Sequence, residues 1–137
     1  MSQPLPKGFL WGNSTSSMQT EGGIHEGGKG QSVYDIRPAT ENSMDWSVTI
    51  DEYHRYEEDF DLMQQMGMNA YRFQISWSRV VPDGDGEFNE EGIEFYRKQI
   101  KALIDRGIKP MICLYHFDMP LALAKKYNGF MSRHVVD

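Results

Sequence analysis

The alternation of strand-like and helix-like segments is the feature that most constrains the fold of this chain. Residues 8–13, 69–77 and 108–115 are short apolar segments typical of strands. Between them, residues 50–66 and 89–107 carry apolar side chains three or four positions apart, which indicates amphipathic helices. Strands and helices that alternate in this order form parallel sheets with right-handed crossovers. The sequence therefore predicts an α/β fold.

The last part of the chain is expected to be helical. Pro120 to Tyr127 reads as a short helix, and Asn128-Gly129 provides the residues that end it. Residues 132–137 have the pattern that opens a further long helix.

The two faces of segment 69–77 differ in polarity. One face carries Tyr71, Phe73, Ile75 and Trp77, and the other carries Arg72, Gln74 and Ser76. A doubly wound sheet would bury both faces under helices, whereas the inside of a barrel can carry polar groups that lead to an active site. A complete (β/α)8 TIM barrel needs roughly 250 residues. We therefore expect residues 1–137 to form the first three β/α units of a truncated TIM barrel, as the N-terminal portion of one domain.

Charge and composition exclude several classes of partner. The chain has 14 basic and 20 acidic residues, a net charge of −6 that argues against nucleic-acid binding. No apolar run reaches the roughly 18 residues of a membrane span, and the first residues lack an apolar signal core. We expect a cytoplasmic protein without a membrane partner. The single cysteine, Cys113, is expected to be a buried, unreactive thiol.

Three polar residues follow or interrupt the predicted strands. Gln19, Arg72 and His116 each belong to a different strand, so all three should face one edge of a parallel sheet. Amide and imidazole groups offer donors and acceptors suited to sugar hydroxyls. A buried arginine needs a carboxylate partner, so we expect one beside Arg72.

Other chemistries have weaker support. The loop Gly23–Gly30 nearly matches a phosphate-binding loop, but Gly30 replaces the serine or threonine that holds magnesium. Two pairs of possible metal ligands lack the further ligands that a metal requires: His25 with Glu26, and His116 with Asp118. We expect neither a metal nor a cofactor.

Three segments carry a specific resemblance. They are residues 9–22 (FLWGNSTSSMQTEG), 68–79 (MNAYRFQISWSR) and 115–120 (YHFDMP). Together they resemble the N-terminal part of glycoside hydrolase family 1, the β-glucosidase clan of retaining β/α-barrel enzymes. The resemblance implies that Gln19 and His116 bind hydroxyls of the sugar before the scissile bond. It also implies that Arg72 orients the nucleophilic glutamate.

Phe117 narrows the expected substrate. Many members of the family carry tryptophan at this position, and phenylalanine followed by Asp-Met-Pro is similar to the branch that acts on 6-phospho-β-glucosides. The expected partner is therefore a small β-glucoside, preferably 6-phosphorylated, bound by Gln19, His116 and Phe117. A β-glucosidase or β-galactosidase for unphosphorylated sugars is the alternative within the family.

The catalytic pair of a retaining glycosidase is absent from these residues. Such enzymes use two carboxyl groups about 5–5.5 Å apart, and the resemblance implies that one belongs to an Asn-Glu-Pro motif. That motif does not occur in residues 1–137. We expect the longer protein to be a hydrolase and these 137 residues to be inactive alone. A non-catalytic remnant that binds sugar is the alternative outside the enzymes.

Overall fold

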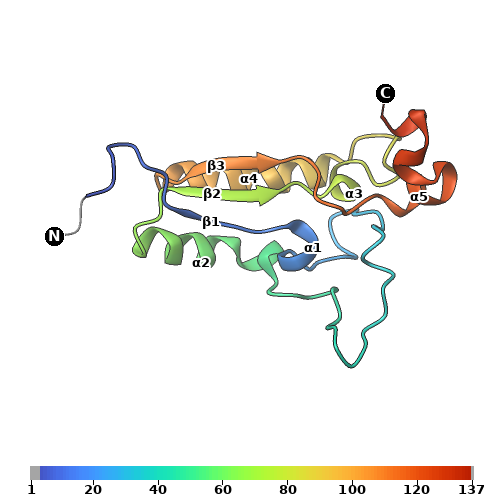
Figure 1. The fold of residues 1–137 in the computed structure, drawn as a ribbon, viewed down its shortest axis with the longest axis horizontal. Helices are drawn as coiled ribbons and strands as arrows, with labels where there is room; N and C mark the ends of the chain where they lie inside the picture. Colours follow the sequence, from blue (N-terminus) through green and yellow to red (C-terminus); the bar gives the residue numbers. More distant parts are fainter. Residues whose placement is uncertain (1–3, 137) are drawn as a thin grey trace.

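The computed structural model describes residues 4–136, and its centre is a three-stranded parallel sheet. The strands β1 (Gly12–Ser14), β2 (Ala70–Gln74) and β3 (Lys109–Cys113) lie in the order β1-β2-β3 (Figure 1). Both neighbouring pairs are parallel. The predicted α/β alternation is therefore confirmed.

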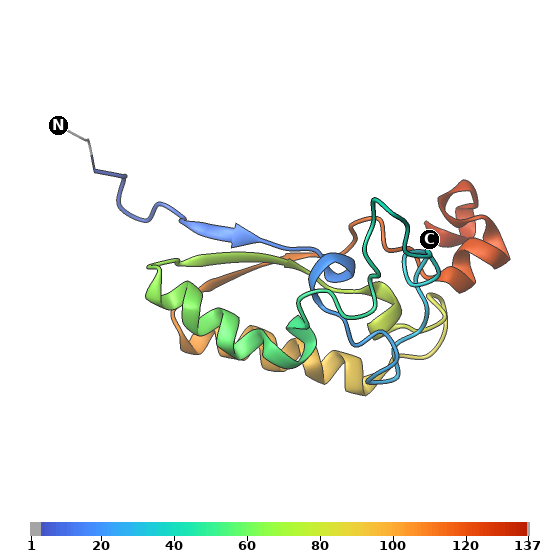
Figure 2. The same ribbon diagram turned by 90° about the horizontal axis from the view of Figure 1, so that it is seen from below.

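Two long helices cover one face of this sheet. They are α2 (Glu52–Gln65) and α4 (Glu90–Asp105), which lie side by side beneath the strands (Figure 2). The buried core between the two layers consists of Phe60, Met63, Tyr71, Phe73, Phe95, Tyr96, Ala102, Leu103 and Ile108. Tyr71 and Phe73 point to these helices as the alternating pattern predicted.

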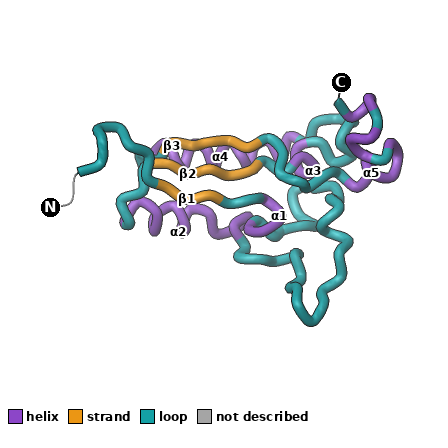
Figure 3. The backbone as a smooth tube through the Cα atoms, in the orientation of Figure 1, coloured by secondary structure: helices purple, strands orange, loops and turns teal. Residues whose placement is uncertain are grey.

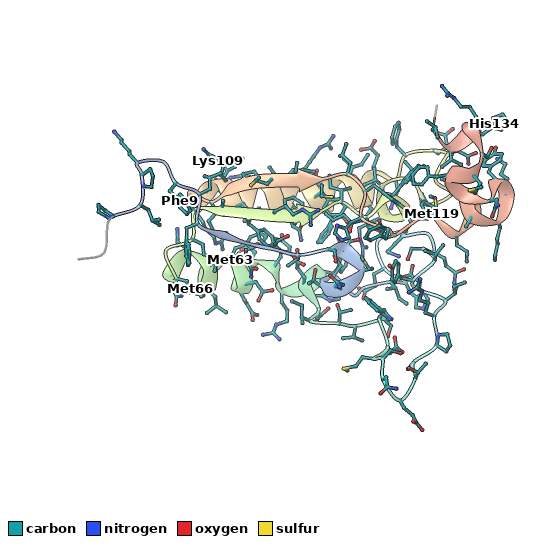
Figure 4. The ribbon with its side chains drawn as sticks, in the orientation of Figure 1. Phe9, Met63, Met66, Lys109, Met119 and His134 are labelled. Atoms are coloured by element: carbon teal, nitrogen blue, oxygen red, sulfur yellow. The ribbon has the colours of Figure 1, made fainter. Side chains whose placement is uncertain are left out.

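The carboxyl ends of the strands carry the short elements and the loops. The helices α1 (Ser17–Thr20), α3 (Trp77–Val80) and α5 (Leu121–Tyr127) all lie at this end (Figure 1). The connection from α1 to α2 is a long irregular loop that extends away from the sheet (Figure 3). Figure 4 shows Met119 at this end of the sheet, with Phe9 and Lys109 at the opposite end.

The strand at 69–77 is shorter than predicted. β2 stops at Gln74, and Trp77 begins α3 instead of continuing the apolar face. Trp77 Nε1 donates a hydrogen bond to the carbonyl of Gly84 at 2.9 Å, so its ring is held by the turn that follows α3. Gln74 and Ser76 are both 1% exposed, so only Arg72 of the predicted polar face remains partly accessible.

The third strand, although nearly continuously apolar in sequence, is not covered on both faces by the described residues. Met111 and Ile112 are 47% and 46% exposed, because helices pack against only one face of the sheet and β3 is its edge. Cys113 is half-buried rather than buried, and its Sγ lies 3.2 Å from the carbonyl oxygen of Tyr115.

The first strand is displaced from the predicted 8–13 toward Ser14. Phe9 and Trp11 are exposed and precede the ladder, while Asn69 holds this segment through hydrogen bonds to both residues. Gly12 allows the close approach of β1 to β2. A Cβ atom there would lie 1.9 Å from the carbonyl oxygen of Ala70.

The helix α5 ends at Asn128 as predicted, but a long helix does not follow. Asn128 adopts the left-handed conformation with φ 60°, and the 3-10 helices η1 (Gly129–Met131) and η2 (Arg133–Val135) come next. The Ser132 hydroxyl accepts from the His134 backbone N–H, which closes a tight turn. Asp137 lies outside the described residues.

Asn89 immediately precedes α4, at the N-cap position, but its side chain bonds elsewhere. Its side chain makes no cap hydrogen bond, and Nδ2 donates to the carbonyl oxygens of Gly27 and Arg79 at 2.6 and 2.8 Å. Asn89 thus ties the start of α4 to the glycine-rich loop.

None of the helices among residues 4–136 has the length and apolar character needed to cross a bilayer.

Candidate functional site

Arg72, within β2, is brought together with His116, which follows the carboxyl end of β3. Arg72 Nη2 lies 3.2 Å from His116 Nδ1, and Arg72 Nη1 donates to Ser14 Oγ at 3.3 Å. A guanidinium has no acceptor, so Nδ1 must accept this hydrogen bond. The ring proton of a neutral His116 is then on Nε2, which can donate to a ligand.

The predicted carboxylate partner of Arg72 is not found among residues 4–136. The guanidinium is only partly buried and bonds to a histidine and a hydroxyl instead. Because water still reaches this side chain, its charge does not require an ion pair within the chain. Its position leaves a cationic donor at the strand ends, where an anionic group can be held.

Gln19 lies on α1 and is exposed. Its Oε1 accepts a hydrogen bond from Ser16 Oγ at 2.5 Å, and its side chain borders an open pocket of about 670 Å³ formed with residues 44–50. The structure shows no direct contact of Gln19 with Arg72 or His116 in the part of the chain that it describes. The three predicted residues therefore share an edge of the sheet without forming one contact group.

Phe117 has the most constrained backbone of the predicted site residues. It is 65% exposed, and its φ of 71° lies in the left-handed region that bulky side chains avoid. Its ring packs edge-on against His116 with centroids 5.0 Å apart. Such strain is retained only where neighbouring groups hold the residue in place.

A buried polar ring, which sequence reasoning missed, lies behind these residues. It consists of Ser17, Gln74 and Asp118, which are at most 5% exposed. Ser17 Oγ donates to Asp118 Oδ2 at 3.0 Å, and the Ser17 backbone N–H donates to Gln74 Oε1 at 3.2 Å. Gln74 Nε2 donates to Asp118 Oδ1 and closes the ring. Burial raises the pKa of Asp118 to about 6, against the effect of these donors.

The buried arginine with a carboxylate partner is Arg79, not Arg72. Arg79 is fully buried, and its Nε donates to Glu21 Oε2 at 3.0 Å. Tyr96 donates from its hydroxyl to the other oxygen of Glu21 at 2.5 Å. Burial raises the pKa of Glu21, and the charge of Arg79 opposes this effect. The signal available in the sequence was Glu21, an acidic residue of the first motif that has no role in the predicted sugar site.

The same arginine argues against nucleotide binding by the glycine-rich loop. Arg79 donates to the carbonyl oxygens of Gly22, Gly23 and Glu26 at 3.2 to 3.4 Å. A phosphate-binding loop points backbone N–H groups at its ligand, whereas this loop points carbonyl groups at an internal cation. Its glycines allow close packing against Tyr53, Asn89 and the carbonyl of Pro82.

The possible metal ligands of the sequence do not form a metal site among residues 4–136, which contain no group of three or more His, Cys, Asp or Glu side chains placed to share an ion. Glu26 bonds to His54 Nε2 at 3.0 Å rather than to His25, and Asp51 bonds to His54 Nδ1 at 2.7 Å. These two carboxylates raise the pKa of His54. The cluster lies on the surface as an ion pair network.

Comparison with known proteins gives consistent relatives. Rice Beta-glucosidase 26 is 46% identical over 137 residues, covering 97% of this chain and 27% of the relative. Aryl-phospho-beta-D-glucosidase BglC of Bacillus subtilis is 44% identical over 139 residues, covering 98% and 29%. A crystal structure of a rice β-glucosidase superimposes with a TM-score of 0.92 at 45% identity, covering 96% of this chain and 28% of that one.

The chain thus spans less than a third of the length of these relatives. Its α/β layers match the corresponding part of the rice enzyme. The sequence model of glycosyl hydrolase family 1 matches residues 1–137, the whole chain. This chain belongs to glycosyl hydrolase family 1.

Proposed function

We propose that residues 1–137 are the N-terminal part of an enzyme that hydrolyses β-glucosides with retention of configuration. The observation that carries this proposal is the contact of Arg72 with His116 at the carboxyl ends of neighbouring parallel strands. Parallel β/α enzymes place their chemistry at this edge. We further propose that the three strands are the first three of an eight-stranded barrel.

The geometry suggests a role for each predicted residue. His116 Nε2 donates to a sugar hydroxyl, because Nδ1 is occupied by Arg72. The exposed amide of Gln19 supplies a further donor and acceptor for the sugar. The remaining N–H groups of Arg72 hold the nucleophilic carboxylate ionised. Phe117 presents its exposed ring to the face of the sugar.

The catalytic carboxylates of this mechanism must come from outside residues 4–136. The most buried acidic side chains here are Glu21, Glu52 and Asp118, and each is held by hydrogen bonds within the protein. None is presented beside Arg72 and His116 as a nucleophile. The 137-residue chain alone is accordingly proposed to be inactive.

A narrower proposal concerns the sugar. Phe117, followed by Asp118-Met119-Pro120, favours a 6-phospho-β-glucoside, and the Bacillus subtilis relative is by name an aryl-phospho-β-glucosidase. Several relatives of similar identity are plant β-glucosidases, which support the unphosphorylated sugar. The family assignment is independent of this choice.

Paired assays on the full-length protein test both levels of the proposal. The substrates are p-nitrophenyl β-glucoside, its 6-phosphate and p-nitrophenyl β-galactoside. Hydrolysis of any of them supports the glycosidase, and kcat/KM for the phosphorylated glucoside above that for the plain one supports the narrower proposal. Binding of glucose-like inhibitors without turnover would favour a sugar-binding remnant, and a chain with neither property would refute the proposal.

A further inference from the structure

Gln19, Arg72 and His116 each stand two positions from a member of the polar ring, and Phe117 is the neighbour of one. The pairs are Gln19 with Ser17 on α1, Arg72 with Gln74 on β2, and His116 with Asp118 in the loop between β3 and α5. The ring therefore joins the three segments that carry the proposed sugar site. Its members are buried, so they are not themselves exposed to a bound sugar.

We propose that Asp118 is a positioning residue of this site, acting through the polar ring on the loop that carries His116 and Phe117. This inference rests on the proposed function, because it assigns the ring a role in placing the sugar-binding groups. Asp118 accepts from two segments distant in sequence, and its carboxylate is the acceptor that both donors require.

The loop has few other anchors. In the described part of the chain, residues 114–118 make no hydrogen bond from main chain to main chain, whereas Ile75 N–H bonds to Cys113 before them and Val33 N–H to Met119 after them. Between these points the hydrogen bonds of the loop are those of the Asp118 side chain, the Arg72–His116 contact and the Cys113 thiol. The ring of Tyr115 also packs against Trp77 and Phe130. A buried side-chain ring of this kind specifies one arrangement when every member is satisfied.

The backbone of Phe117 shows that the loop is held against its own preference. Its left-handed conformation lies between two anchored neighbours, His116 at Arg72 and Asp118 in the polar ring. Release of the second anchor allows Phe117 to return to an ordinary conformation. Such a change would move the ring of His116 away from Arg72, and with it the donor at Nε2.

An exchange of the amide and the carboxylate tests this role. Asp118→Asn alone removes one of the two acceptors, and Gln74→Glu alone sets two carboxylates side by side. In the double variant the introduced amide can donate to the introduced carboxylate, while its oxygen accepts from Ser17 Oγ. The carboxylate at position 74 still accepts from the Ser17 backbone N–H, so the ring is rebuilt with the same charge.

The full-length protein is assayed with the best glucoside found in the paired assays, at a temperature where every variant is folded by circular dichroism. We expect kcat/KM to fall roughly 10- to 100-fold in each single variant, as misplacement of binding groups does. The double variant should recover to within about threefold of the parent. Gln99→Glu is the matched control, because Gln99 is also 1% exposed but lies on α4 away from the ring.

The control separates positioning from stability. Gln99→Glu should lower the melting temperature and leave kcat/KM unchanged. Single ring variants that keep kcat/KM within twofold of the parent while folded would overturn the proposal. A double variant that recovers its melting temperature but not kcat/KM would overturn it as well.

A second readout does not depend on catalysis. Histidine ring ¹H–¹⁵N spectra of the full-length protein report the hydrogen bond at His116 Nδ1. We expect its signals to shift in both single variants and to return in the double variant. If the parent hydrolyses no glucoside, the proposed function fails while these spectra still decide the positioning role. Unchanged His116 signals in the single variants would refute it.

Discussion

Ser17 Oγ donates to Asp118 Oδ2 at 3.0 Å across 101 positions of sequence. The bond joins α1 to the loop after β3, and Gln74 on β2 completes the connection through both residues. The segments that follow β1 and β3 are thereby connected with β2 through one buried polar cluster. These buried hydrogen bonds position the segments that carry the proposed site residues.

The carboxyl group of Asp118 should make stability depend on pH. Its folded pKa of about 6 exceeds the ordinary value of 3.8, so the folded state binds the proton more tightly than the unfolded state does. The contribution of Asp118 protonation to the free energy of unfolding is fully present below pH 4 and is lost as the pH rises through 6. At low pH it amounts to about 3 kcal/mol.

Urea denaturation of the parent and of Asp118→Asn between pH 3.5 and 7.5 measures this contribution. The difference in unfolding free energy between the two proteins should change in favour of the variant as the pH rises from 4 to 6. Comparison with the variant cancels the titration of Glu21 and Glu52, whose pKa values are also raised by burial. A difference that is constant across this range would contradict the prediction.

The buried pair of Glu21 with Arg79 should be among the most sensitive points for stability. Glu21→Gln leaves the buried guanidinium without its counter-charge, and we expect a loss of about 3–5 kcal/mol in unfolding free energy. Glu58→Gln is the matched control, because Glu58 pairs with Arg55 at 2.8 Å on the surface. Urea midpoints should fall strongly for the first variant and hardly at all for the second. Equal midpoints would refute the structural role of Arg79.

His116 should act through a donor at Nε2. His116→Ala is expected to lower kcat/KM for the preferred glucoside roughly 10- to 100-fold, the range of one lost hydrogen bond to a ligand. His116→Gln should lose less, because its amide can accept from Arg72 and still donate outward. His25→Ala, an exposed histidine in the glycine-rich loop, serves as the control and should leave the rate unchanged. A larger loss for glutamine than for alanine would contradict this assignment.

The open face of the sheet should cause the isolated 137-residue chain to associate. Met111 shares a face with Arg72 and is 47% exposed, and Leu114, just past the end of β3, is 76% exposed. Exposed apolar strands at a sheet edge promote association. Light scattering after size exclusion should show a mass above 15.8 kDa, and Met111→Lys should lower it. If the unsubstituted 137-residue chain were a monomer with a cooperative melting transition, the truncated-barrel interpretation would be contradicted.

Periodicity was sufficient to predict the order of the main elements. The helical stripe at residues 50–66 became α2, the stripe at 89–107 became α4, and the three apolar segments became neighbouring parallel strands. These features follow from local patterns, because the burial of one helix face or one strand face repeats at a fixed spacing. The errors concern the ends of the elements. Trp77 belongs to α3 rather than to the strand, and the segment after α5 forms two short 3-10 helices instead of a long helix.

The contacts within the site were less predictable. Arg72 and Arg79 belong to the same motif, and residue type alone does not say which of them is buried. The end of β2 at Gln74 and the turn of α3 direct Arg79 inward, onto Glu21 and the glycine-rich loop. Arg72 stays on the strand and meets His116.

The family, the alternation of strands and helices, and the edge of the sheet that carries Gln19, Arg72 and His116 can all be predicted from the amino-acid sequence. These depend on motifs and on patterns within a few neighbouring residues. The packing of distant segments determines which arginine is buried, which acid connects the segments after β1 and β3 with β2, and the strained backbone of Phe117. Those outcomes depend on contacts such as Ser17 with Asp118, whose desolvation and hydrogen bonding are defined only after distant segments pack together.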